Sequence, residues 1–267
     1  MPTFQGNPFS NFYKRILQIN QSSNTGVDAT TRTIQTGDGV NTSMSVSDDV
    51  LQVQPQNDDT TGTFLVKNNS GTELLKVDST NSLVKALDHN VNTQYATFGI
   101  NATDSASLTA NNHYAIPYQV NSYSDASNMP TFGTGTDPAT TFTTADSNAQ
   151  RASDIVPLLW RVPDNITIDE IKHFEGADAA TGDSAIRMHL MSYTFTSGST
   201  SCLSSGAVIA NTSADNTNAG SEQAYLKDWT INTANVDAGK VLLCMFRSDS
   251  INSDFSILVN IKYHIRG

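Results

Sequence analysis

Short apolar runs separated by turn residues fill the first third of the chain. Residues 64–87 read FLVKNNSGTELLKVDSTNSLVKAL, where each apolar run follows the previous one after about ten residues. Asn-Asn-Ser-Gly and Asp-Ser-Thr-Asn stand between the runs, and these residues tolerate positive φ or form Asx turns. The pattern predicts strands joined by tight turns, without helices. The strands expected are 43–47, 50–54, 63–67, 73–78 and 82–87.

Residues 21–90 offer few apolar side chains for a core, and many of these are valine. The free energy gained by burying these side chains is smaller than the conformational entropy cost of ordering the segment. Two arrangements would supply the missing burial of apolar surface. Either three copies share one core around an axis, or a small sheet of this segment lies on the C-terminal domain of the same chain. We expect the shared stem, because it also pairs open strand edges between chains.

Residues 1–20 are richer in aromatic residues than the segment that follows. FSNFYKRILQI, residues 9–19, fits a short helix with Ser10 as its N-cap. Two interpretations stay open: a terminal segment packed on its own domain, or a peg that docks aromatic side chains into another protein. Aromatic residues are the usual interface anchors. On the second interpretation the anchoring residues are Phe4, Phe9, Phe12 and Tyr13.

Residues 113–267 predict an independent β-domain, preceded by a connector at 91–112. Several apolar runs alternate with polar residues, and no helical period occurs, which indicates a β-sandwich or jelly roll. The polar insert at 121–150 is expected to be a surface loop, where binding residues concentrate. The strands expected are 113–120, 155–162, 166–176, 185–195, 206–211, 223–231, 240–248 and 256–265.

Composition and charge exclude two classes of partner. Apolar residues are 37% and charged residues 15% of the 267-residue chain, which leaves a surface of neutral polar residues. With 15 basic against 26 acidic residues, the net charge is −11, and sequence-independent nucleic-acid binding needs the opposite balance. No apolar stretch approaches the roughly 18 residues of a membrane span, and a signal-peptide core is lacking. We expect no nucleic acid and no membrane insertion.

Candidate catalytic and metal-binding residues do not form a motif. The five histidines lack metal-ligand spacing, and GxSxG is absent. Asp169 and Glu170 adjoin in a strand and should point to opposite faces, unlike the paired carboxylates of glycosidases. Cys244 lies in the apolar run VLLCMF and predicts a buried thiol, although a disulfide to Cys202 stays open. We expect no catalytic residue, no metal and no cofactor.

Five aromatic residues of the C-terminal region divide into core and surface candidates. Trp160 and Trp229 lie among apolar neighbours and are expected in the core. Tyr114, Tyr118 and Tyr123 lie near the polar insert and are candidates for surface recognition.

Residues 25–87 resemble the repetitive stem of tailed-bacteriophage fibres, in which strings of the type F-x-V-x-x-x-x-G-x-x-L-L-x-V-D-x-x-N are common. The downstream strings WRVPDNITIDEIK, LMSYTF, DWTINTANVDAGKVLL and VNIKYHIRG are similar to head domains of such fibres, particularly those of marine phages. The residues that carry the stem string are Phe64, Val66, Gly71, Leu74, Leu75, Val77, Asp78 and Asn81.

The resemblance implies an all-β homotrimeric virion protein. Residues 1–20 would be a virion-anchoring segment that binds another virion structural protein. Residues 21–90 would form a trimeric β-stem, and residues 113–267 a jelly-roll-like β-sandwich head.

The expected function is therefore structural: a fibre or capsid decoration, not an enzyme, whose heads contact a host-surface glycan or protein multivalently. Two alternatives are a monomeric carbohydrate-binding module with a disordered tail and a glycan depolymerase. The first predicts a solution mass near 28.7 kDa. The second predicts carboxylates that converge in a cleft of the head.

Overall fold

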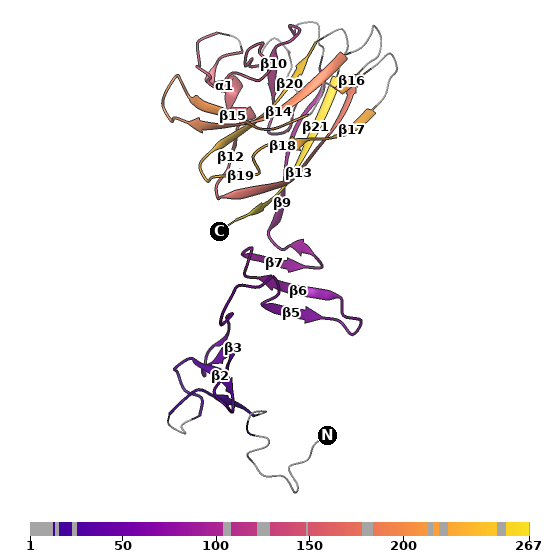
Figure 1. The fold of residues 1–267 in the computed structure, drawn as a ribbon. Coiled ribbons are helices and arrows are strands. Elements are labelled where there is room, and N and C mark those ends of the chain that lie inside the picture. The colour runs from indigo at the N-terminus through magenta and orange to yellow at the C-terminus, as the bar shows by residue number, and fades with distance from the viewer. Residues whose placement is uncertain are drawn as a thin grey trace. The chain divides into compact units, whose positions relative to one another are not determined.

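The computed structural model describes residues 13, 16–22, 26–103, 108–121, 129–147, 149–177, 184–212, 216–218, 224–249 and 255–266. Strands dominate these residues, which confirms the all-β class (Figure 1). The chain divides into two compact units, Met1–Val91 and Asn92–Gly267, called here the N-terminal unit and the C-terminal unit.

Two four-stranded antiparallel sheets make up the described part of the N-terminal unit. Each of the five strands expected in this region is present. Gly71 closes the hairpin between the strands Phe64–Lys67 and Glu73–Asp78 with a φ of 88° and donates its N–H to the Asn68 carbonyl oxygen at 3.0 Å. The first sheet has the order β1 (Leu17–Ile19), β2 (Arg32–Thr36), β3 (Asn41–Val46) and β4 (Leu51–Val53). The second sheet has the order β5 (Phe64–Lys67), β6 (Glu73–Asp78), β7 (Leu83–Ala86) and β8 (His89–Asn90).

Strand β1 corrects the end of the helix expected at 9–19, of which residues 9–12, 14 and 15 lie outside the described residues. Its residues Leu17–Ile19 pair with β2, so that Ile19 lies opposite Ile34. The β-branched Ile19 fits a pleated, half-buried surface well. The end of the proposed anchoring segment 1–20 thus belongs to the first sheet.

Two larger sheets make up the C-terminal unit. The six-stranded sheet has the order β11 (Gln119–Asn121), β9 (Thr93–Thr103), β21 (Phe255–Ile265), β13 (Ile166–Ala177) and β17 (Ala224–Asp228), with β19 (Asn235–Val236) also on β13. The seven-stranded sheet has the order β10 (His113–Ile116), β20 (Val241–Ser248), β14 (Ser184–Phe195), β15 (Leu203–Asn211) and β18 (Thr230–Ile231), with β12 (Trp160–Arg161) on β20 and β16 (Asn216–Asn218) on β14.

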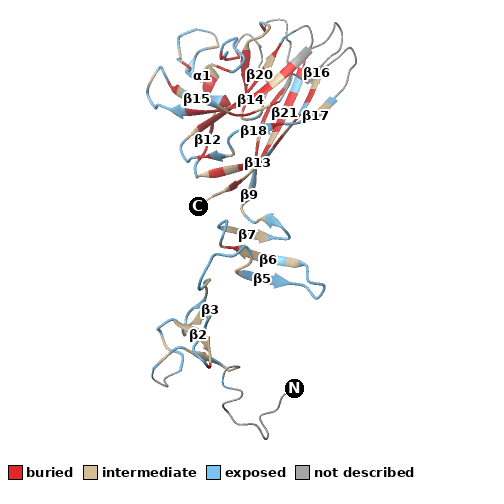
Figure 2. Ribbon diagram, in the orientation of Figure 1, coloured by how far each residue is buried: buried red, intermediate tan, exposed pale blue. Residues whose placement is uncertain are grey.

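Both large sheets contribute to one apolar core. Phe98, Val259 and Ile171 come from the six-stranded sheet, and Leu190 and Phe246 come from the seven-stranded sheet. Figure 2 shows the buried residues concentrated in these strands. The two expected core tryptophans, both buried, are part of this cluster, which confirms their prediction.

The seven-stranded sheet is covered on its second face as well. Phe132, Phe142 and Leu158 pack there against Tyr193 and Leu243 in a separate apolar cluster. Residues 241–246 are buried one after another, which explains the continuous apolar run VLLCMF, because a strand covered on both faces need not alternate. The insert at 121–150, expected to be a surface loop, therefore supplies part of the core.

Two expected element boundaries differ from the structure. Residues 155–162 were expected as one strand but form the end of the short helix α1 (Ala152–Ile155), a 3₁₀ turn (Val156–Leu158) and β12. Pro157 fits the first turn of a helix because its missing N–H needs no partner there. The expected connector 91–112 contains β9, whose Ala96, Phe98 and Ile100 point into the core.

Candidate assembly surfaces and other candidate sites

The first sheet of the N-terminal unit has one largely apolar face. Cross-strand partners share a face, and side chains alternate along each strand. Ile19 lies opposite Ile34, Val46 opposite Leu51, and Met44 opposite Val53. Arg32, which binds Asp28 through both guanidinium NH groups, shares this face. The opposite face carries the neutral polar residues Gln18, Thr33, Gln35, Ser45 and Gln52.

The second sheet is divided more sharply. On one face Phe64, Val77 and Val84 lie in one cross-strand row, and Val66, Leu75 and Ala86 lie in the next. We call these six residues the β5–β7 apolar face. On the other face Leu65, Lys76 and Lys85 lie in one row.

Ion pairs stabilise the polar side of the second sheet. Lys76 lies 3.1 Å and Lys67 3.6 Å from the Glu73 carboxylate. The hydrogen bond from Lys76 holds the pKa of Glu73 below its usual value. This face is thus suited to water, whereas the β5–β7 apolar face has no charged side chain on its three strands.

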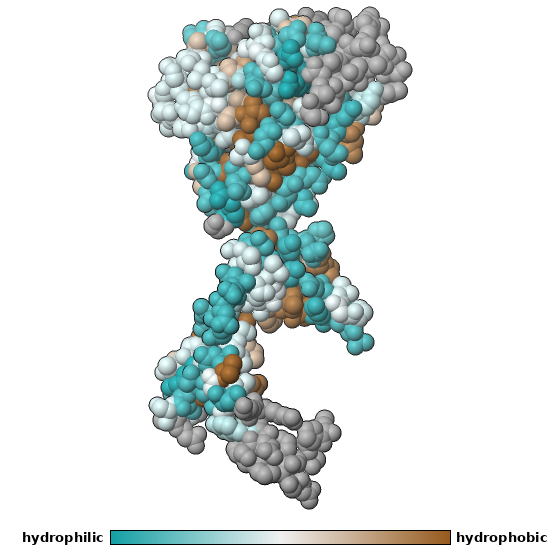
Figure 3. Space-filling model, viewed as in Figure 1, coloured by the Kyte–Doolittle hydropathy of each residue, from teal (hydrophilic) through white to brown (hydrophobic). Residues whose placement is uncertain are grey.

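The apolar faces are left uncovered within the N-terminal unit itself. Among the described residues of the N-terminal unit, no apolar side chain is buried. Phe64 is 41% exposed, Val66 39% and Leu51 68%. Apolar atoms accordingly show at the surface of this unit in Figure 3. Contiguous apolar surface of this kind is typical of a protein interface.

Only Tyr13 of the four predicted anchoring residues lies within the described residues, since Phe4, Phe9 and Phe12 fall outside them. Tyr13 is exposed, and its carbonyl oxygen accepts a hydrogen bond from the Ile16 N–H at 3.1 Å. That carbonyl also lies against Gly37, where a Cβ atom would approach it to 1.9 Å. Glycine is required at position 37 for this close approach.

The tyrosines expected at a recognition surface have different positions. Tyr114 is 5% exposed, its ring stacks on Phe246 at 5.8 Å, and its hydroxyl accepts the Thr109 N–H at 2.7 Å. This burial corrects the expectation for Tyr114, because the aromatic ring is committed to the core. Tyr118 is partly buried and stacks on Trp160 at 5.9 Å, and Tyr123 lies outside the described residues.

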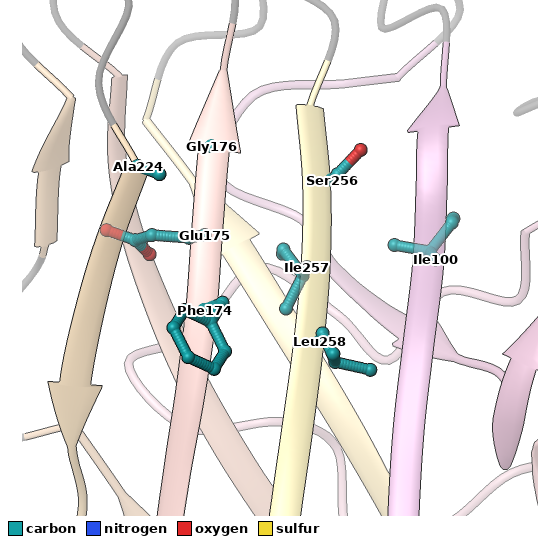
Figure 4. A pocket seen from close by; sticks show the side chains of 8 residues that line it. All are labelled: Ile100, Phe174, Glu175, Gly176, Ala224, Ser256, Ile257 and Leu258. Carbon is teal, nitrogen blue, oxygen red and sulfur yellow. The ribbon is translucent and has the colours of Figure 1, made fainter.

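A shallow hollow of about 310 Å³ lies on the six-stranded sheet (Figure 4). Ala224, Gly176 and Ser256 form one cross-strand row of small residues. The next row holds the exposed Leu226 and Phe174 together with Leu258. Phe174 and Leu258 of this second row line the hollow that the small residues leave.

A buried polar triad lies beneath the same strands. The Trp229 indole N–H donates to Nδ1 of His173 at 2.8 Å, so the proton of the neutral ring is on Nε2. Nε2 then donates to Glu175 at 3.0 Å. The chain Trp229–His173–Glu175 links β13 to the segment before β18.

Paired catalytic carboxylates do not occur at the sequence candidates. Asp169 lies at a register irregularity of β13, 2.9 Å from Nδ1 of His264, whereas Glu170 lies 3.2 Å from Lys172. Each carboxylate thus has its own basic partner. Cys202 and Cys244 are buried free thiols, and burial raises the pKa of both.

Within the described residues, no group of histidine, cysteine and acidic side chains is arranged to hold a metal ion. The helices described there are all too short or too polar to cross a membrane. No protein-family model matches the chain, and no curated protein sequence matches it.

Proposed function

We propose that the chain is a homotrimeric structural protein of a tailed-phage virion, either a fibre or a capsid decoration. In this proposal the N-terminal unit is a three-chain β-stem, and the C-terminal unit is a jelly-roll-like β-sandwich head. The observation that carries the assembly is the β5–β7 apolar face, which the described residues of the N-terminal unit leave uncovered. The resemblance of residues 25–87 to fibre stems supports the virion assignment.

Three copies around an axis would cover the apolar faces of the N-terminal unit. Each narrow apolar face then meets two others, while the charged face with Glu73 and Lys76 stays in water. All four residues of the edge strand β5 are exposed, and an unpaired edge of this kind is otherwise open to aggregation. Pairing the edges within a closed trimer removes that hazard.

The assembly is tested with neighbouring substitutions on opposite faces of β5. Val66 and Leu65 are 39% and 40% exposed, so exposure alone predicts the same effect for both. Val66→Asp places a charge on the apolar face and should dissociate the trimer to a species near 28.7 kDa. Leu65→Asp, beside Lys76, should leave the trimer intact. Light scattering after size exclusion measures both masses, and equal masses would contradict the proposal.

The N-terminal segment is proposed to attach the stem to another virion protein through Phe4, Phe9, Phe12 and Tyr13. Because β1 belongs to the first sheet, the informative deletion removes residues 1–12 and not 1–20. The truncated protein should form the same trimer and fail to join particles. Normal incorporation into particles would show that attachment lies elsewhere.

In the proposed virion, the heads contact a host-surface glycan or protein. Many weak head contacts per particle reach useful avidity without a tight single site. The exposed Phe174 beside the hollow of the six-stranded sheet favours glycan binding as a second candidate function, since aromatic rings stack on sugars. Glycan-array binding that Phe174→Ala abolishes would support it, and unchanged binding would remove Phe174 from the site.

A further inference from the structure

Four basic side chains lie together on one face of the seven-stranded sheet, the face that packs against Phe132 and Phe142. His113 in β10 lies directly opposite Arg247 in β20, which lies opposite Arg187 in β14. His189 follows Arg187 by two residues and therefore points to the same face. The His113 and His189 rings meet edge to face, with centroids 4.9 Å apart. Both histidines are fully buried.

Several polar atoms of this cluster have no hydrogen-bond partner. In the described part of the chain, six buried side-chain atoms are unpaired, and four of them are Nε2 of His113, Nε of Arg187 and both ring nitrogens of His189. Buried polar atoms in folded proteins are nearly always paired with protein, water or a bound ion. Four such atoms on one face of one sheet, two residues of which are in ring contact, point to a small polar species that completes the cluster.

The charge of the cluster selects an anion. Arg247 donates to the side chain and carbonyl of Asn111, at 2.6 and 3.3 Å, so its charge stays uncompensated. Among the described residues, Asp137 supplies the carboxylate that lies within ion-pair distance of the four basic side chains. Its Oδ1 atom is 3.7 Å from Nε2 of His189, and its side chain is mostly exposed. Two guanidinium groups on adjacent strands repel each other and any bound cation.

The hydrogen-bonding pattern narrows the class of anion. Nδ1 of His113 lies 3.1 Å from the Gly133 carbonyl oxygen, which can only accept, so Nδ1 carries the proton. Burial lowers the pKa of His113, which leaves the ring neutral and Nε2 a hydrogen-bond acceptor. The cluster thus presents donors on Arg187 and His189 beside one acceptor on His113.

We propose that Arg187, His189 and His113 bind a small oxyanion that carries a proton, of which hydrogen phosphate is the common example. Its unprotonated oxygens accept from Arg187 and His189, and its hydroxyl donates to His113. Sulfate lacks this proton at neutral pH. The binding site stabilises the C-terminal unit, and it does not depend on the proposed virion function.

Thermal unfolding of the full chain at pH 7 tests the site. Both tryptophans lie in the C-terminal unit, so their fluorescence follows that unit. Sodium phosphate should raise the unfolding midpoint by a few degrees over chloride at equal ionic strength, whereas sulfate should not. Glucose 6-phosphate should have no effect, because the fully buried histidines admit only the free ion. An equal shift with sulfate or glucose 6-phosphate would overturn the protonated free anion as ligand.

Paired arginine variants locate the site. Arg187→Gln should abolish the phosphate shift, whereas Arg161→Gln, at an exposed position of β12, should retain it. A full shift in Arg187→Gln would overturn the proposal. Calorimetric titration of the unsubstituted chain with phosphate decides the matter even if Arg187→Gln fails to fold. The expected result is one site per chain, and no binding would mean that the cluster holds only water.

Discussion

Phe64 in β5 lies directly opposite Val77 in β6, on a face that the described residues of the N-terminal unit do not cover. Val84 in β7 continues the row on the other side of Val77. A cross-strand row of apolar side chains stabilises a sheet when another layer covers it. This row is therefore the observation on which the proposal of a stem shared between chains rests.

A shared stem predicts that the two units respond differently to protein concentration. The C-terminal unit has its own core, so its unfolding by urea, followed by tryptophan fluorescence, should not depend on concentration. The N-terminal unit should unfold at higher urea as protein rises from about 1 to about 50 µM, because association stabilises only the assembled state. Far-UV circular dichroism in the same titration reports both units. Concentration-independent unfolding of both units would contradict a shared core.

Tyr193 provides a test of the layer that covers the seven-stranded sheet. Its hydroxyl is buried and donates to the Ala139 carbonyl at 2.6 Å, and burial raises the pKa of that hydroxyl. Tyr193→Phe should lower the free energy of unfolding by about 1–2 kcal/mol, because the carbonyl loses its partner. Urea unfolding measures the change, and a difference near zero would mean that water replaces the hydroxyl.

Gly206 in β15 tests the packing around the Tyr193 ring. A Cβ atom at this position would lie 2.4 Å from the Tyr193 ring and 2.9 Å from the Thr140 Cα. Gly206→Ala should therefore destabilise the C-terminal unit by about 1–3 kcal/mol. Ser204→Ala, in the same strand at a partly exposed position, is the matched control and should change stability little. Equal stability of the two variants would show that this layer is not packed as described.

The buried histidine pair predicts that acid destabilises the C-terminal unit. Burial, followed by the charges of His113, Arg187 and Arg247, lowers the pKa of His189 to about 3 from the 6.5 expected in the unfolded chain. Between these values the unfolded state binds a proton that the folded state does not. Stability is thus fully present above pH 6.5 and is lost as pH falls toward 3, with a loss of roughly 3 kcal/mol from His189 by pH 4.

Urea unfolding in phosphate-free buffer at pH 7, 5 and 4 measures this loss. Asp137 is the described carboxylate that faces the pair and opposes part of the effect. His189→Gln should flatten the pH dependence, whereas His89→Gln, at an exposed position of the N-terminal unit, should leave it unchanged. If His189→Gln kept the full slope, the acid sensitivity would have another origin.

The strand pattern of the chain was largely predictable, because turn residues and alternation recur wherever one face meets water. The strand and loop prediction was less accurate for β9 and for the insert at 121–150. In β9 the core residues alternate with small or polar ones in a segment of low apolar content, where the sequence allowed a short helix or a strand within a connector. In 121–150, Phe132 and Phe142 are isolated apolar residues without a period, so their burial depends on tertiary contacts.

The candidate sites were less predictable than the fold. The amphipathic stem strands indicated the apolar face from alternation alone. Tyr114 was expected at the surface, but its burial depends on Phe246, which is far away in the sequence. The basic cluster was missed because its members come from three strands, and only the register brings Arg187, Arg247 and His113 into one row.

The solution mass of the unsubstituted full chain tests the central claim most directly. Light scattering at low micromolar concentration should give three times 28.7 kDa, about 86 kDa, if three copies cover the apolar faces of the N-terminal unit as proposed. A mass of 28.7 kDa, with the N-terminal unit still folded by circular dichroism, would contradict the shared stem and the function proposed from it.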